Sequence, residues 1–162
     1  LFTIKTKAGI ERRAHYVPAY LQPYLKRLSG RTLIAVNLGG CLIPMIFSLY
    51  LFITQSLMAG EVILGILLVS VVSYVYSFPV KGIGIGMPML ISPLFAAIIA
   101  IMINSDSSAP LAYISGTMGV LIGADLLKFR HVSQMGAMIA SIGGAGTFDG
   151  IFMTGILAVL LA

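Results

Sequence analysis

Five long apolar runs, separated by short polar segments, follow one another along most of the chain. They cover residues 33–52, 62–76, 87–103, 110–127 and 136–162. A helix needs about 20 mostly apolar residues to cross the hydrocarbon core of a bilayer. The first run meets this length, and the others come close to it when interfacial residues are counted. The pattern therefore predicts an all-α membrane protein with about five transmembrane helices, formed by a domain of residues 32–162.

The first 31 residues follow a different pattern. Residues 1–7 alternate between apolar and polar, Ala8-Gly9 is a turn signal, and residues 14–18 could be a returning strand. Residues 20–28 mix aromatic and basic side chains, which is typical of the lipid headgroup layer. We expect residues 1–31 to form a basic interfacial segment that contains a short β-hairpin or an amphipathic stretch.

Two glycine-rich segments interrupt the apolar sequence, one over residues 81–88 and the other over residues 141–147. Glycine at this density disfavours helix. Irregular backbone at membrane depth is tolerated only inside protein or beside water. The segments are therefore predicted to be helix breaks or re-entrant loops, and we consider four of their glycines as substrate-binding positions: Gly84, Gly86, Gly144 and Gly146.

Composition strengthens the membrane interpretation. Hydrophobic residue types make up 59% of the chain and charged types only 9%, whereas a soluble domain usually carries about 25% charged residues. The membrane domain leaves no room for a large soluble catalytic domain. The formal net charge is +5, but the basic region is short and no nucleic-acid recognition motif accompanies it, so we expect membrane lipids and no nucleic acid as partners.

The distribution of positive charge predicts the orientation. With five spans, every Lys and Arg falls on one side of the membrane, because Lys81, Lys128 and Arg130 join the basic N-terminal segment there. Cytoplasmic loops carry an excess of Lys and Arg. We therefore expect a multi-pass protein of the cell membrane with a cytoplasmic N-terminus.

Two carboxylates, Asp125 and Asp149, lie within or at the end of predicted spans, where ionisable residues are costly and often functional. The fourth run descends to the cytoplasm and the fifth leaves it, so both carboxylates are expected at similar depth. Two facing carboxylates can share one proton, after which one activates a water and the other protonates a leaving group. The spacing thus suggests Asp125 and Asp149 as catalytic residues.

A purely structural interpretation of the same residues is also open. Asp125 and Lys128 are three residues apart and could pair at a helix end. Asp149 could occupy the first turn of a helix capped by Thr147, where a negative charge is favoured. A stripe of small residues predicts close contact with another helix; it comprises Ser115, Gly119 and Gly123.

The remaining polar candidates point to binding or packing. Asn37 lies beside glycines inside the first run, where its amide needs a partner and could also contact a substrate. His15 and His131 have no metal-ligand spacing, and Cys41 has no convincing triad partner. We therefore expect neither a metal nor a cofactor.

Three motifs resemble conserved elements of an uncharacterised archaeal and bacterial membrane-protein family, described as a domain of unknown function. They are the segments 32–44, 123–127 and 141–152, and the last is the most specific. The resemblance extends over nearly the whole chain and implies a multi-pass membrane protein. A weaker likeness is to presenilin-like intramembrane aspartyl proteases, which implies Asp125 and Asp149 as the catalytic pair. In this chain Thr147 and Phe148 separate the glycine motif from Asp149.

Together these features suggest an intramembrane aspartyl-protease-like hydrolase that acts on membrane-embedded peptides and could form a homo-oligomer. The alternatives are a small transporter or channel subunit, in which the glycine-rich breaks line a path, and a membrane assembly factor without catalysis.

Overall fold

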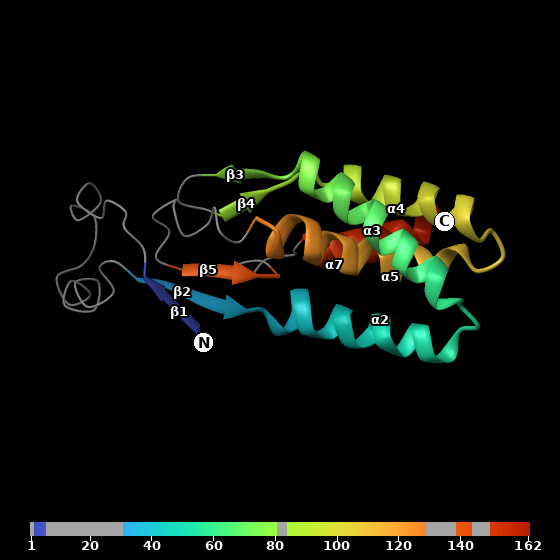
Figure 1. Ribbon diagram of the computed structural model, residues 1–162, viewed down its shortest axis with the longest axis horizontal. Helices are drawn as coiled ribbons and strands as arrows, with labels where there is room; N and C mark the ends of the chain where they lie inside the picture. The colour runs from blue at the N-terminus through green and yellow to red at the C-terminus, as the bar shows by residue number, and fades with distance from the viewer. Residues whose placement is uncertain (1, 6–30, 81–83, 129–138, 144–149) are drawn as a thin grey trace.

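The computed structural model describes residues 2–5, 31–80, 84–128, 139–143 and 150–162, and within them the chain is a bundle of apolar helices with two small sheets at one end (Figure 1). The predominantly helical fold predicted from the sequence is confirmed. The loops between consecutive helices at the opposite end are short. The helices are α2 (Ile43–Thr54), α3 (Ala59–Tyr76), α4 (Ile91–Ile103), α5 (Ser108–Val120) and α7 (Gly150–Leu161).

Two of these helices are extended by π-helical turns. The segment η3 (Leu38–Leu42) leads into α2, and η4 (Leu121–Leu126) continues α5. Among the described residues, two helices are long and apolar enough to cross a membrane, namely α3 and the combined helix Ser108–Leu126. The other apolar helices described are shorter: Leu38–Thr54, Ile91–Ile103 and Gly150–Leu161. The count of five spans stays a prediction.

Helix α5 is the centre of the bundle and packs against α2, α3, α4 and α7. Close approach is possible because small residues line its contacts. A methyl group added at Gly116 would lie 3.1 Å from Thr154 Cγ2 of α7 and 3.3 Å from Ala96 Cβ of α4. On another face, a methyl group at Gly119 would lie 2.7 Å from Val69 Cβ of α3. The close helix contact predicted from the stripe of small residues is thereby confirmed.

The first sheet has the order β1-β2-β5 and joins distant parts of the sequence. Strand β1 (Phe2–Lys5) is antiparallel to β2 (Arg31–Val36), and β2 is parallel to β5 (Ile139–Ile142). The described partner of β1 is therefore residues 31–34 of β2. The proposed returning strand at 14–18 lies outside the described residues.

These strands also shift the starts of two predicted spans. The first run begins at residue 33 and the fifth at residue 136, but residues 31–36 and 139–142 are strands. In the first run helix begins at Leu38, and in the fifth the described helix is Gly150–Leu161. The physical reason is that a short apolar run rich in β-branched residues suits a buried strand as well as a helix. Pairing between β2 and β5 gives hydrogen-bond partners to the backbone along their facing edges.

The first glycine-rich segment is part of a β-hairpin. Strand β3 (Phe78–Val80) pairs with β4 (Gly84–Gly86) in an antiparallel register that places Pro79 opposite Ile85. The hairpin joins α3 to α4 at the sheet end of the bundle (Figure 1). The prediction that glycine interrupts helix here is confirmed.

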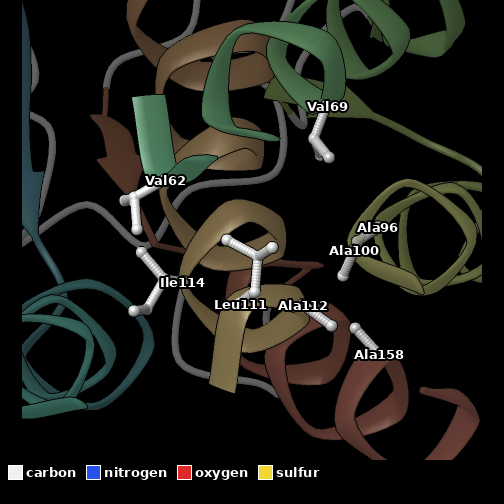
Figure 2. Packing of buried hydrophobic residues seen from close by; sticks show 8 residues of the cluster. All are labelled: Val62, Val69, Ala96, Ala100, Leu111, Ala112, Ile114 and Ala158. Atoms are coloured by element: carbon white, nitrogen blue, oxygen red, sulfur yellow. The ribbon is translucent and has the colours of Figure 1, made fainter. Parts of the chain in front are cut away.

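The buried core consists mainly of small side chains. Figure 2 shows Leu111 and Ala112 of α5 among residues of the neighbouring helices, including Ala96 and Ala100 of α4 and Ala158 of α7. Buried hydroxyls are numerous; they include Ser48, Ser70, Ser73, Ser77, Ser92, Ser108, Ser115, Thr117 and Thr154. Ser73 Oγ lies 3.1 Å from Ser92 Oγ, which links α3 to α4 inside the bundle.

Candidate functional site

Asp125 lies in the π-helical turn η4, where α5 reaches the sheet end of the bundle. Its Oδ2 accepts a hydrogen bond from the backbone N–H of Gly143 at 3.2 Å. Gly143 follows β5 directly and has a φ of +83°, a conformation that glycine adopts at little cost. A π-helical turn inside an α-helix is uncommon and occurs frequently at functional sites.

Asn37 connects the end of β2 to the start of η3 and uses its backbone and its side chain to do so. Its backbone N–H donates to the carbonyl of Ile142 at 2.9 Å, which fastens it to the end of β5. Its Oδ1 accepts from the N–H of Gly39 at 3.0 Å, and its carbonyl accepts from the N–H of Cys41 at 3.0 Å. Asn37 and Gly143 therefore lie side by side, directly after the ends of the parallel strands β2 and β5.

An apolar cluster lies beside these polar groups. Its buried members come from η3, the α5–η4 helix and α7, and they are Cys41, Val120, Leu121, Ala124 and Ile151. Ile85 of β4 and Met87, the residue directly after β4, pack against this cluster. Ile151 is thus packed in one cluster with Ala124, the residue before Asp125.

Lys128 is directed towards α3. Its Nζ donates to the carbonyl of Ser77 and lies 4.8 Å from the centre of the Tyr74 ring. Burial lowers the pKa of Lys128, because removing the ammonium from water disfavours its charged form. These contacts fix the end of α5 to the end of α3 and give Lys128 a structural role at the sheet end.

The comparison with protein families gives a match that covers almost the whole chain. The model for the family described as "Protein of unknown function (DUF1614)" matches residues 1–161. The chain belongs to the DUF1614 family. No curated protein and no solved structure matches it significantly. The membership agrees with the resemblance to a family of unknown function that the three sequence motifs carry.

In this DUF1614 protein the predicted site residues fall into three groups. Asp125 and Asn37 lie at one junction, which consists of Asn37, Ile142, Gly143 and Asp125. Asn37 donates to the carbonyl of Ile142, and the N–H of Gly143 donates to Asp125. Gly84 and Gly86 lie in β4 at the same end of the bundle. The other candidates lie outside the described residues: Asp149, Gly144 and Gly146.

Sequence reasoning missed Gly143, although this residue donates to Asp125. A backbone N–H can belong to any residue type except proline, so its role leaves no trace in the residue identity. The signal that was available is the Gly143-Gly144 pair directly after an apolar strand, which marks a change of backbone direction. Among the described residues of the DUF1614 protein, no group of three His, Cys, Asp or Glu side chains is placed to hold a metal ion.

Proposed function

We propose that this chain is an integral membrane protein in which five apolar helical segments cross the bilayer. The observation that carries the proposal is the distribution of side-chain size across the bundle. Large apolar side chains are exposed on the outside of α2, α3, α4 and α7, with exposed fractions up to 81% at Met102. The interior is instead rich in alanine, glycine, serine and threonine, with a smaller number of larger apolar side chains such as Leu111 and Ile151 among them.

This arrangement suits lipid as the solvent. In water, so continuous an exposed apolar surface would promote aggregation, because monomeric soluble proteins rarely expose large apolar patches. In a bilayer the same side chains contact acyl chains, and helices associate through close packing of small residues. Gly65 against Ser115 and Gly119 against Val69 are contacts of this kind.

The two ends of the bundle differ in charge, which supports an orientation. Lys5, Arg31 and Lys128 lie at the sheet end, whereas Glu61 and Asp106 lie at the opposite end, beside the α2–α3 and α4–α5 loops (Figure 1). Positive residues accumulate on the cytoplasmic side of membrane proteins. We therefore assign the sheet end and the N-terminus to the cytoplasm.

Labelling of engineered cysteines tests this topology. In a Cys41→Ser background, Asp106→Cys is expected to react with a membrane-impermeant maleimide in intact cells, because its loop is outside. Leu127→Cys, at an exposed position near the sheet end, is expected to react only after permeabilisation. The proposal is wrong if both positions react equally in intact cells, or if the protein stays in solution without detergent.

For the activity, we propose an intramembrane aspartyl hydrolase that uses Asp125 and Asp149 on membrane-embedded peptides. The supporting observation is the packing of Gly150 and Ile151, which directly follow Asp149. Ile151 is buried in the cluster that contains Ala124, and a methyl group at Gly150 would lie 3.6 Å from Met87 Cε. The start of α7 is thereby held beside the helix that carries Asp125.

The chemistry needs one ionised and one protonated carboxyl group. The ionised group takes a proton from water while the water oxygen adds to the peptide carbonyl carbon. The protonated group then gives its proton to the amide nitrogen as the C–N bond breaks, which leaves a new carboxyl and a new amino terminus. Asp125 Oδ2 accepts a hydrogen bond from the Gly143 N–H, and we assign Asp125 as the base and Asp149 as the acid.

Purified protein in detergent or liposomes, mixed with a fluorescently labelled transmembrane peptide, tests the activity. We expect two fragments whose masses add up to the substrate plus one water. If no peptide of a varied set is cleaved, the hydrolase proposal is wrong and the membrane proposal stands.

A second candidate, an ion-coupled transporter, is favoured by the irregular backbone around the same carboxylate. Two π-helical turns, η3 and η4, contribute residues to the same apolar cluster. Ser70 Oγ, close to η4, is buried without a hydrogen-bond partner among the described residues. Discontinuous helices of this type bind ions in transporters. Asp125-dependent ion flux into liposomes, without peptide cleavage, would select this function.

A further inference from the structure

We infer that Asn37 is a positioning residue for the Asp125 carboxylate, acting through Gly143, and that it is not a contact for substrate. The inference uses the proposed function only in calling Asp125 catalytic. The positioning itself is a property of the hydrogen bonds between β2, η3, β5 and η4. It can therefore be tested without any activity.

The first step concerns the hydrogen bond that the Asn37 side chain makes. Its Oδ1 accepts from the N–H of Gly39 at 3.0 Å, so the oxygen is already used in starting η3. This is the arrangement of a helix N-cap, in which a side-chain oxygen satisfies an N–H of the first turn. The start of η3 therefore accounts for the position of this oxygen without a bound ligand.

The second step links Asn37 to Asp125. The Asn37 N–H donates to the Ile142 carbonyl at 2.9 Å, and the next N–H along that strand, from Gly143, donates to Asp125 Oδ2 at 3.2 Å. The peptide unit between Ile142 and Gly143 is planar, so fixing its carbonyl also fixes the direction of its N–H. Asn37 and Asp125 thus hold opposite sides of one peptide group.

The third step provides a reporter. Cys41 is the only cysteine in the chain and is 6% exposed. It packs against Gly143, where an added methyl group would lie 2.7 Å from Cys41 Cβ. Any loosening of the Asn37–Ile142–Gly143–Asp125 connection should uncover this thiol. Its reaction with N-ethylmaleimide in detergent-solubilised full-length protein therefore measures the integrity of the junction.

Asn37→Ala removes the capping oxygen and is expected to raise the reaction rate of Cys41 about fivefold, the equilibrium change that corresponds to a typical lost cap. Asn37→Asp keeps an acceptor and should react at nearly the wild-type rate. Asn104→Ala is the matched control, because Asn104 Oδ1 also accepts a backbone N–H, from Ser107 at 3.1 Å, but at the other end of the bundle. It should leave the Cys41 rate unchanged.

Hydrogen exchange of the wild-type protein gives a second test that needs no variant. The amides of Asn37 and Gly143 should exchange more slowly than unprotected amides. The inference is overturned if either exchanges at the unprotected rate, or if Asn37→Ala and Asn104→Ala change the Cys41 rate equally.

Where cleavage is measurable, positioning and substrate contact give different kinetics. A positioning role predicts that Asn37→Ala lowers kcat with KM nearly unchanged, and that Asn37→Asp restores kcat. A raised KM with an unchanged Cys41 rate would identify a substrate contact and overturn the inference. If no peptide is cleaved at all, the hydrolase proposal fails, while the Cys41 rates and hydrogen exchange still decide the role of Asn37.

Discussion

Asp125→Asn and Asp149→Asn are each expected to lower kcat for peptide cleavage by about 10³-fold, within the range that general acid–base catalysis contributes. An amide can neither take the proton of the attacking water nor protonate the leaving nitrogen. The asparagine side-chain oxygen at position 125 can still accept the Gly143 N–H, so the fold around it should persist. Initial rates with a labelled transmembrane peptide, together with thermal unfolding in detergent, measure both effects.

Asp106→Asn is the control for this pair of variants. It makes the same chemical change in the exposed α4–α5 loop, at the end of the bundle opposite to Asp125. Its kcat should equal that of the wild type. Full cleavage by Asp125→Asn or by Asp149→Asn would exclude the carboxylate mechanism. Equal losses in all three variants would show that the effect is not specific to these two carboxylates.

Gly123→Ala should have the largest effect on stability, a loss of about 3 kcal/mol in the free energy of unfolding, at the upper end of overpacking costs. The added methyl group would press against the backbone carbonyl of Ser70, and backbone cannot rotate aside as a flexible side chain can. Helix α3 would have to move away from η4. Thermal unfolding of the purified protein in a fixed detergent gives the difference.

Gly60→Ala provides the matched control, because it makes the same substitution in an exposed part of α3. Nothing lies within 4 Å of the added methyl group there, and alanine is favoured over glycine in a helix by about 0.5 kcal/mol. This variant should be slightly more stable than the wild type. Similar stabilities for Gly123→Ala and Gly60→Ala would contradict the close contact between α3 and η4.

Sequence patterns predicted the helices and one of their contacts because both depend on side-chain type. Ser115, Gly119 and Gly123 recur at helical spacing, and each faces α3 at close range: Ser115 at Gly65, Gly119 at Val69 and Gly123 at Ser70. Size alone sets how closely two helices approach, so a stripe of small residues is informative without knowledge of the partner helix.

The pairing of strands and the partner of Asp125 could not be predicted in the same way. Strands β2 and β5 are about a hundred residues apart in the sequence, and hydropathy alone does not distinguish a short apolar strand from a helix start. The hydrogen bond to Asp125 comes from a backbone N–H, which almost every residue carries. Asp125 and Asn37 could therefore be proposed as site residues from the sequence, whereas the hydrogen-bonded connection between them could not be predicted.

The shortness of α4 has a consequence for the surrounding lipid. With 13 residues it is only about 20 Å long, against a hydrocarbon thickness of roughly 30 Å. In the proposed membrane arrangement, acyl chains beside α4 would have to shorten to match, at a small energy per ångström of mismatch. The cytoplasmic leaflet would dip there towards the bilayer midplane, drawing headgroups and hydration water closer to the level of Asp125, and the protein would partition into thinner membranes.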